Sequence, residues 1–228
     1  MHQPPPPMDD DIRAFDAMYA RAAGDAEVIP WSHRAPHPLL IGWLDEALGV
    51  SLVGSGRALV IASGLGDDAE ELARRGWQTT AFDGSPTAIS WAQRRYPASA
   101  VDYHVADLFA LPPSWRHGFD LVLENRTIQS LPPERHPAAV AAIAATVAPG
   151  GLLVAIAHGR DETEPAEHRP WPLARSELDA FAALGLVEQS FTDTWREHAD
   201  GSGRRPRLFR AVYRRPAPAA ESSLGGTT

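Results

Sequence analysis

The sequence ALVIASGLGDDA, residues 58–69, decides the fold of this chain. Its opening residues are apolar and uninterrupted, which is typical of a strand that is buried on both faces of a parallel sheet. Gly64 and Gly66 follow, and glycines let the backbone turn tightly and approach a ligand closely. A helical pattern begins at Asp68. A strand, a glycine turn and a helix in this order predict a ligand site at the mouth of an α/β sheet.

Short apolar runs alternate with longer amphipathic runs on both sides of this stretch, a pattern that favours a parallel sheet covered by helices. The final pair of strands is joined by a polar connection that contains glycine, which predicts an antiparallel hairpin at the sheet edge. The expected elements are helices 9–23 and 38–48, strand 58–62, helix 68–75, strand 78–82, helix 86–95, strands 101–105 and 119–123, helix 133–147, a turn at 149–151, strand 152–157, helix 175–184, and strands 187–192 and 208–213.

Length and composition limit the class of protein. A chain of 228 residues suits one domain. The proline-rich ends, 1–8 and 216–228, are expected to be disordered, which leaves 9–215 as the folded part, with a helical cap at 9–50 and a core at 57–215. No apolar run approaches the roughly 20 residues that cross a bilayer, and residues 1–8 lack the features of a secretion signal. We therefore expect a cytoplasmic protein without a membrane partner.

Charge and cysteine content exclude further classes of function. The chain has no cysteine, which removes disulfides, thiolate nucleophiles and cysteine-ligated zinc. Its net charge of -8 would repel a polyphosphate backbone, so nucleic acid is not the expected partner. A small neutral or cationic ligand fits this charge better.

Carboxylates at the ends of the second and third predicted strands point to a nucleoside. Asp83 follows the second strand, where a carboxylate can accept both hydroxyl groups of an adenosine ribose. Asp107 follows the third strand and would lie beside the adenine amino group, with Leu108 against the ring. Since the carboxyl ends of parallel strands meet at one edge of the sheet, these groups would converge on one ligand.

A dinucleotide-binding dehydrogenase is the main alternative, because Gly64, Gly66 and Ala69 also fit a looser dinucleotide fingerprint. Asp67 and Asp68, however, would repel a pyrophosphate at this turn. S-adenosylmethionine has no phosphate and carries a sulfonium and an ammonium, which acidic neighbours favour. This charge argument favours a methyltransferase, while an NAD-dependent oxidoreductase and a non-catalytic nucleoside-binding module remain as alternatives.

The chain resembles the class I methyltransferases. Five segments carry the resemblance, from the first motif to the approach to the fifth strand: Leu59 to Gly66, Phe82-Asp83, Ala106-Asp107, Phe119 to Glu124 and Pro149-Gly150-Gly151. Within this class it is most similar to the thiopurine and thiol methyltransferase-like group, which shares the segments Pro30-Trp31 and Pro38-Leu39-Leu40.

The resemblance implies a Rossmann-like, doubly wound, mostly parallel sheet of seven strands with an antiparallel C-terminal hairpin and an N-terminal helical extension. It also implies that Trp31 packs near the methionine end of the cofactor. Val60 stands where the family has an acid, and Ala62 stands where it has its first glycine. Asp67 or Asp68 would then replace the missing acid beside the cofactor ammonium. The residues predicted to bind S-adenosylmethionine are Trp31, Ala62, Gly64, Gly66, Asp68, Asp83, Gly84, Ser85, Asp107, Leu108 and Glu124.

Methyl transfer from a sulfonium requires alignment, removal of water and, for some acceptors, removal of a proton. We therefore predict a methyltransferase of class EC 2.1.1.- that acts on a sulfur, nitrogen or oxygen atom of a small molecule. His158 is the candidate general base, and Glu124 the second catalytic candidate. The predicted acceptor-binding residues are His33, Arg34, Asn125, Arg160 and Trp171.

Each of these assignments has a plainer interpretation. His158 could bond a neighbouring loop, Glu124 could pair with Arg126, and Trp31 could belong to the core. Glu124, Asn125 and Asp161 could in principle gather around magnesium, but no motif for such a site is visible and we predict no metal. The segment from Asp161 to Pro172 is acidic and rich in proline, which predicts either a lid over the acceptor or a solvated loop.

Overall fold

The computed structural model describes residues 9–32, 34–47, 56–195 and 206–218. Seven strands of these residues form one sheet in the order β3-β2-β1-β4-β5-β7-β6. Strand β7 runs antiparallel to both β5 and β6, and the remaining pairs are parallel. This confirms the predicted fold class and the C-terminal hairpin. The strands are β1 Arg57–Ile61, β2 Gln78–Asp83, β3 Asp102–Val105, β4 Phe119–Asn125, β5 Val147–His158, β6 Val187–Trp195 and β7 Arg207–Arg214.

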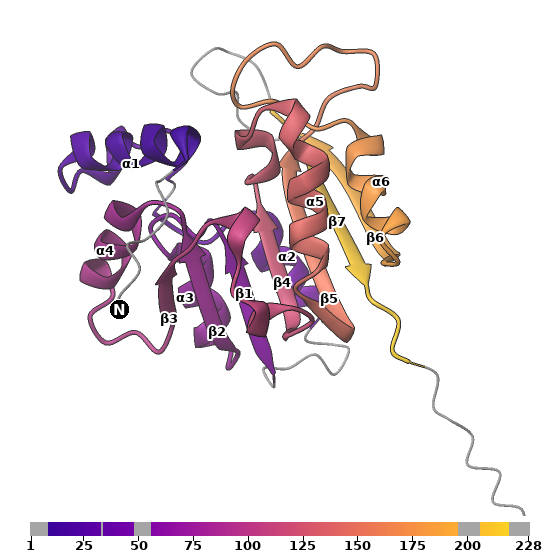
Figure 1. The fold of residues 1–228 in the computed structure, drawn as a ribbon, viewed down its shortest axis with the longest axis horizontal. Coiled ribbons are helices and arrows are strands. Elements are labelled where there is room, and N and C mark those ends of the chain that lie inside the picture. Colours follow the sequence, from indigo (N-terminus) through magenta and orange to yellow (C-terminus); the bar gives the residue numbers. More distant parts are fainter. Residues whose placement is uncertain (1–8, 33, 48–55, 196–205, 219–228) are drawn as a thin grey trace, which may run out of the picture.

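Helices cover both faces of this sheet (Figure 1). Side chains alternate between the two faces along each strand. In β1, Leu59 and Ile61 join the core under α5 and α6, whereas Ala58 and Val60 join the core under α2 and α3. The helices are α1 Asp10–Ala22, α2 Pro38–Ala47, α3 Asp67–Arg74, α4 Pro86–Arg95, α5 His136–Ala144 and α6 Arg175–Ala183, with short 3₁₀ turns η1 Ala26–Val28, η2 Leu108–Ala110, η3 Pro113–Trp115, η4 Ile128–Ser130 and η5 Pro133–Arg135.

Helix α1 lies over the end of the sheet beside α4 (Figure 1). Asp9 caps it by accepting a hydrogen bond from the N–H of Asp11 at 2.9 Å. Asp16 of α1 accepts from the Ser85 hydroxyl at 2.6 Å and from the N–H of Thr87 at 2.9 Å. A side chain of α1 therefore stabilises the start of α4, which fixes α1 above the loop that follows β2.

The region between α5 and β5 differs from the prediction. The helix expected at 133–147 is divided into η5 and the shorter α5, and the turn expected at 149–151 is wrong, because these residues already belong to β5. The pairing of β4 with β5 is irregular between Phe119 and Leu121, and Gly150 has a φ of 81°. The N–H of Gly150 bonds the carbonyl of Arg215 at 2.8 Å, so the proline and glycines distort a strand without ending it.

The tails predicted to be disordered are 1–8 and 216–228, and of these, residues 1–8 and 219–228 lie outside the described residues. The predicted domain boundaries stay predictions. None of the described helices combines the length and the apolar character that a membrane crossing requires.

The packing of β1 gives a test of the core. Leu59 is 0% exposed at the centre of the sheet, whereas Leu184, just beyond α6, is 40% exposed. We expect Leu59→Ala to lower the free energy of unfolding by about 2–5 kcal/mol, because it leaves a cavity that the surrounding strands fill only in part. Leu184→Ala, the matched control, is expected to lower it by less than about 1 kcal/mol. Urea denaturation measures both values, and equal losses would contradict this description of the core.

Candidate cofactor and acceptor site

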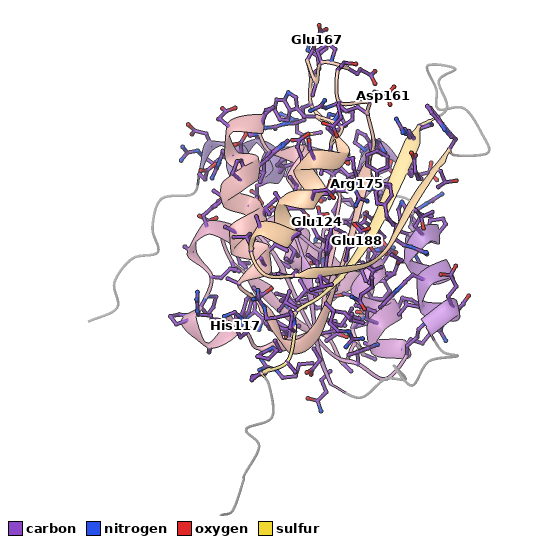
Figure 2. The ribbon with its side chains drawn as sticks, turned by 90° about the vertical axis from the view of Figure 1, so that its right-hand side faces the viewer. His117, Glu124, Asp161, Glu167, Arg175 and Glu188 are labelled. Atoms are coloured by element: carbon purple, nitrogen blue, oxygen red, sulfur yellow. The ribbon has the colours of Figure 1, made fainter. Side chains whose placement is uncertain are left out.

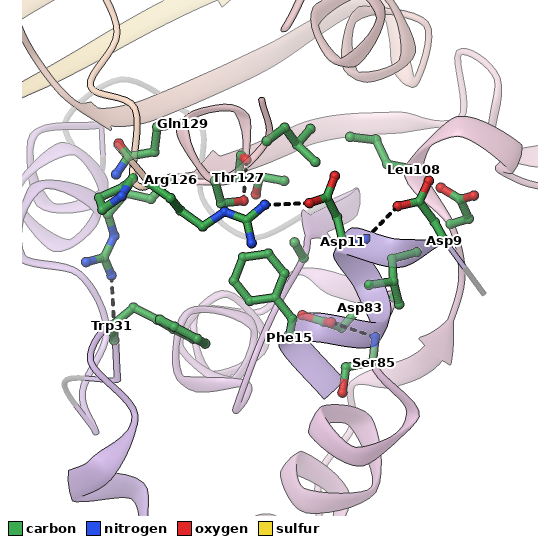
Figure 3. A pocket seen from close by; sticks show the side chains of 18 of the residues that line it. Asp9, Asp11, Phe15, Trp31, Asp83, Ser85, Leu108, Arg126, Thr127 and Gln129 are labelled. Atoms are coloured by element: carbon green, nitrogen blue, oxygen red, sulfur yellow. Dashed lines mark hydrogen bonds and ion pairs between the residues drawn. The ribbon is translucent and has the colours of Figure 1, made fainter. Parts of the chain in front are cut away.

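A cavity of about 500 Å³ opens at the carboxyl ends of the parallel strands, beneath α1 (Figure 3). The end of a parallel sheet is where ligands bind in open α/β folds. A smaller cavity of about 100 Å³ lies beside it, against the glycine turn after β1. The two cavities share Tyr19, Trp31, Ala62, Asn125 and Arg126 in their walls. They therefore form one site with a large and a small compartment.

Asp83 ends β2 and lines the large cavity. One carboxylate oxygen accepts the N–H of Gly64 at 2.9 Å, and the other accepts the N–H of Ser85 at 2.9 Å. Burial raises the pKa of Asp83, and these two backbone donors oppose the increase. Each oxygen keeps a further lone pair, so the carboxylate can still accept hydrogen bonds from a ligand. Gly84 and Ser85 line the cavity beside it, as predicted for the cofactor-binding set.

The glycine turn has left-handed backbone at three positions. Ala62, Gly64 and Gly66 have φ values of 47°, 53° and 90°. Ala62 and Gly64 line the small cavity, in agreement with their predicted positions. Gly66 lines neither cavity, and a Cβ there would overlap the Tyr103 hydroxyl. Gly66 thus meets a packing requirement of α3, and the structure does not place it against a ligand.

The two acidic residues after the glycine turn have different surroundings. Asp67 forms an ion pair with Arg95, at 2.9 and 3.0 Å. Asp68 accepts the main-chain N–H of His37 at 2.7 Å and the side-chain amide of Asn125 at 2.7 Å. Burial raises the pKa of Asp68, and these donors oppose the increase. Since a guanidinium already compensates Asp67, Asp68 is the carboxylate that can act on a cationic ligand in the small cavity.

Arg126 follows β4 and lines both cavities, although the sequence analysis assigned it no ligand. It donates to the Asn125 side-chain oxygen at 3.2 Å and to the main-chain oxygen of Trp31 at 3.3 Å (Figure 3). Its φ of 63° is left-handed, which is uncommon for a residue with a side chain and occurs preferentially at functional sites. The indole of Trp31 donates to the Tyr19 hydroxyl at 2.9 Å, which holds the ring at the boundary between the compartments.

Asp107 and Leu108 lie at the opposite end of the large cavity, after β3. One oxygen of Asp107 accepts the N–H of Phe109 at 2.9 Å and caps η2. Leu108 is buried beside it. A carboxylate next to an apolar side chain is the arrangement predicted for the adenine end of the cofactor.

Glu124 is not in the cavity, contrary to its assignment as a catalytic and cofactor-binding residue. It is 0% exposed and lines neither compartment; Figure 2 shows it in the interior of the molecule. One oxygen accepts the N–H groups of Thr127 at 2.6 Å and of Ile128 at 3.1 Å, and the other has no hydrogen-bond partner among the described residues. Burial raises the pKa of Glu124 to about 7, and these N–H groups oppose the increase. Its visible role is to hold the backbone turn beneath the cavity.

His158 ends β5 and lines the large cavity, where a general base is possible. Its main-chain N–H donates to the side-chain oxygen of Gln129. The main-chain oxygen of Gln129 accepts the N–H of Trp171 at 2.7 Å. Gln129 is buried and also lines the cavity. It lies beyond the end of β4, and no motif in the sequence marked it as a residue of the site.

The structure gathers few of the predicted acceptor-binding residues. Asn125 lines the site, but His33 lies outside the described residues. Arg34 is exposed and pairs with Glu27 at 2.8 Å. Arg160 and Trp171 line neither cavity. The side chains of Arg34, Arg160 and Trp171 make other contacts, because their prediction rested more on chain position than on residue type.

The magnesium alternative finds no support in the described residues, which contain no group of three metal-ligating His, Asp or Glu side chains. Asp161, a member of the triad considered from sequence, pairs with Arg207 instead.

Helix α1 supplies wall residues that were not predicted individually. Phe15 lies against Trp31, with ring centroids 5.4 Å apart in an edge-to-face arrangement. Asp11 pairs with Arg135 at 3.1 Å and with Arg169, whose guanidinium lies 5.0 Å from the Phe15 ring. The sequence predicted a helical cap at 9–50, but its pattern did not indicate which side chains of this helix line the site.

The pKa of Glu124 gives a test of this burial. Between pH 4.5, the ordinary pKa of a glutamate, and about pH 7, Glu124 keeps its proton in the folded protein but loses it in the unfolded chain. The contribution of this proton to the stability of the fold is therefore full below pH 4.5 and is lost as the pH rises to about 7. Between these values we expect the free energy of unfolding of the wild type to fall by about 2–3 kcal/mol relative to Glu124→Gln, which does not titrate. Urea denaturation at several pH values measures this difference. Parallel pH profiles for the two proteins would argue against the raised pKa.

Residues 58–151 match the family model of a methyltransferase domain. This segment runs from β1 into β5 and contains the glycine turn, Asp83 and Asp107. No curated protein matches the chain.

Solved structures with the same fold cover nearly the whole chain. One is a protein of echinomycin biosynthesis, described in the conversion of a disulfide bond into a thioacetal group, with 22% identity, a TM-score of 0.72 and coverage of 92% of this chain and 93% of that chain. A second is the 1,6-didemethyltoxoflavin N1-methyltransferase of Burkholderia thailandensis, with 17% identity, a TM-score of 0.66 and coverage of 95% and 93%. A third is the N-methyltransferase NodS of Bradyrhizobium japonicum WM9, with 22% identity, a TM-score of 0.66 and coverage of 91% and 100%.

The second and third of these structures contain S-adenosylhomocysteine. At these sequence identities the similarity to the solved structures establishes the fold alone. The family model adds that residues 58–151 match a methyltransferase domain. Together they support the predicted class I, S-adenosylmethionine-dependent methyltransferase and its cofactor. The narrower resemblance to the thiopurine and thiol methyltransferase group stays a prediction.

Proposed function

We propose that this protein transfers a methyl group from S-adenosylmethionine to a sulfur, nitrogen or oxygen atom of a small molecule. The observation that carries the proposal is the pair of strand-end carboxylates, Asp83 and Asp107, in one cavity with the glycine turn of Gly64 beside it. This arrangement suits a nucleoside without phosphates. Two solved neighbours are named as N-methyltransferases, and the one from Burkholderia thailandensis is named for the small molecule 1,6-didemethyltoxoflavin, which supports the proposed acceptor class.

The residues present fit both ends of the cofactor. Asp83 would accept the ribose hydroxyls, with Gly84 and Ser85 beside it, and Asp107 with Leu108 would hold the adenine. The small cavity suits the amino-acid end, because the hydroxyl groups of Ser32 and Ser63 in its wall are buried and have no hydrogen-bond partner among the described residues. A polar ligand group would satisfy these hydroxyls. The remaining residues proposed for the cofactor are Trp31, Ala62, Gly64 and Asp68.

Opposite charges also meet in the small cavity. Asp68 and Arg126 both bond the side chain of Asn125, which separates them and fixes their positions. An ammonium would lie favourably near Asp68 and a carboxylate near Arg126. Asp68 would thus replace the acid that is missing at Val60.

The residues on the acceptor side have a limited task, because the sulfonium supplies an already activated methyl carbon when the cofactor is bound. Phe15 and Trp31 provide aromatic walls, and Arg169 and Pro170 add to the lining. These walls exclude water, which strengthens electrostatic interactions inside the site. His158 lies where it can accept a proton from an acceptor that has one to lose.

Asp83 can be tested by its affinity for the product nucleoside. We expect Asp83→Ala to weaken the binding of S-adenosylhomocysteine at least tenfold, because the ribose loses its acceptor and the backbone of Gly64 and Ser85 loses its anchor. Asp179→Ala, at an exposed carboxylate of α6, should leave the affinity unchanged. Calorimetric titration with S-adenosylhomocysteine and with NADH decides between the main proposal and a dehydrogenase. Tighter binding of NADH by the wild type would overturn the proposal.

Arg126 allows the amino-acid end to be tested separately. Glycine adopts a φ of 63° without strain, so Arg126→Gly removes the guanidinium while the backbone keeps its conformation. We expect this variant to bind S-adenosylhomocysteine at least tenfold more weakly and to bind 5′-methylthioadenosine, which lacks the amino-acid group, within twofold of the wild type. Arg94→Gln, an exposed site on α4, is a control for the lost charge. An equal loss for both ligands would show that Arg126 acts on something other than the amino-acid end.

A further inference from the structure

A carboxylate outside the cavity connects three elements on its acceptor side. Glu177 lies in the first turn of α6 and accepts the N–H of Ala174 at 2.8 Å, which caps this helix. The same oxygen accepts a guanidinium N–H of Arg160 at 2.8 Å, and the other oxygen bonds Nδ1 of His136 at 2.7 Å. Glu177, Arg160 and His136 are not among the residues that line the cavity. Their contacts therefore affect a ligand only through other residues.

Arg160 organises the chain segment that follows β5. Its guanidinium donates to the main-chain oxygens of Pro172 at 2.9 Å, Asp161 at 3.1 Å and Glu164 at 2.8 Å. The ends of the segment are joined, since the N–H of Arg160 bonds the oxygen of Leu173 at 2.9 Å. A guanidinium presents five donors in a fixed plane, so one side chain can hold several carbonyl groups of a loop together. The segment 161–172 is therefore folded around Arg160.

The same segment forms part of the cavity wall. Arg169 and Pro170 line the cavity, and Arg169 pairs with Asp11 of α1. The N–H of Trp171 donates to the main-chain oxygen of Gln129, another residue of the wall, at 2.7 Å. Displacement of the segment would therefore move Arg169 and Pro170 in the wall and break the ion pair of Arg169 with Asp11 of α1.

His136 connects Glu177 to a further part of the wall. Its Nδ1 faces the carboxylate of Glu177 and its Nε2 faces the main-chain oxygen of Leu131, at 2.9 Å. Both partners only accept hydrogen bonds, whereas a neutral imidazole has one N–H to donate. The two bonds are satisfied together only by the imidazolium form. Leu131 lines the cavity, so a protonated His136 fixes this part of the wall to Glu177.

The charges around His136 are consistent with a cation. Glu177 faces it from α6, with Arg160 on the far side of that carboxylate, and the buried Glu124 interacts with it from β4. Burial raises the pKa of Glu177 and the hydrogen bonds from His136 and Ala174 lower it, with a net decrease. The carboxylate of Glu177 thus lies between the guanidinium of Arg160 and the imidazole of His136.

We propose that Glu177 is a positioning residue for the methyl acceptor: through Arg160 it fixes the segment 161–172, and through an imidazolium at His136 it fixes Leu131. The role toward a methyl acceptor rests on the proposed function, whereas the contacts of Glu177 with Arg160 and His136 do not depend on it. The cofactor end stands apart from it, because the side chains of Asp83 and Asp107 bond other residues.

The test compares Glu177→Gln with Glu167→Gln, the same change at an exposed position in the segment (Figure 2). For Glu177→Gln we expect hydrogen exchange at the amides of Arg160, Trp171 and Leu173 to accelerate at least tenfold. The side-chain ¹⁵N spectrum at pH 7 should change from two protonated nitrogens at His136 to one. S-adenosylhomocysteine affinity should stay within twofold of the wild type. Glu167→Gln should change none of these quantities.

A second variant guards against a general loss of structure. Arg160→Lys keeps the positive charge beside Glu177 but loses the planar set of guanidinium donors. It should therefore accelerate amide hydrogen exchange in the segment 161–172 and leave both nitrogens of His136 protonated in the ¹⁵N spectrum. With an acceptor found among thiols, phenols and heterocyclic nitrogens and labelled cofactor, Glu177→Gln should raise the KM of that acceptor at least fivefold and change kcat less than twofold.

Three results would overturn the proposal. The first is a singly protonated His136 in the wild type, and the second is unchanged amide hydrogen exchange in both Glu177→Gln and Arg160→Lys. The third is a Glu177→Gln variant whose affinity for S-adenosylhomocysteine falls by the same factor as its amide exchange accelerates. A wild type that does not bind S-adenosylhomocysteine would instead refute the proposed function. In that case the exchange and ¹⁵N results would still report on the network itself.

Discussion

The carboxylate of Asp83 is the interaction on which the ligand site depends. It joins the turn after β1 to the turn after β2 through one backbone hydrogen bond from each, and it does so in a buried position. An unpaired charge at this depth would be strongly unfavourable, so the two turns and the carboxylate stabilise one another. The remaining lone pairs of the carboxylate are free to accept hydrogen bonds from a ligand in the cavity. In the proposed function, one residue thus combines the closure of the sheet end with recognition of the ribose.

The two ends of the site are held by different physical means. The cofactor end is formed by strand ends and short turns, whose positions follow from the hydrogen-bonded register of the sheet. The proposed acceptor end is formed by α1, by η4 and by the segment 161–172. Ion pairs between side chains far apart in sequence, such as Asp11 with Arg169 and Arg160 with Glu177, hold α1 and this segment. A wall held by side-chain pairs can change with few substitutions while the sheet stays intact. This division is consistent with one fold serving many acceptors.

Glu124 illustrates how a correct element can carry a wrong role. Its place at the end of β4 was predicted correctly, and a carboxylate there suggested contact with a ligand. Alternation along the strand directs its side chain to the face covered by α5, where it bonds the N–H groups of Thr127 and Ile128. The next residues, Asn125 and Arg126, reach the cavity instead. Which of several adjacent polar residues faces a ligand depends on the path of the backbone after the strand, and a left-handed residue at Arg126 could not be read from the pattern.

The sequence by itself determined the sheet, its hairpin and the carboxylate-rich cofactor end, because periodicity and strand-end position depend on residues that are close in the chain. Ala62, Gly64, Asp68, Asp83 and Asp107, which the sequence predicts for the cofactor, all line the cavities, and their role there stays a prediction. Only the tertiary structure decided the contacts of the proposed acceptor end: which side chains of α1 line the cavity, that Arg160 folds its own loop, and that Glu177 joins Arg160 to His136. These contacts join residues separated by up to 158 positions, as for Asp11 and Arg169. No local pattern encodes such a pair, since either partner alone looks like an ordinary charge on the surface.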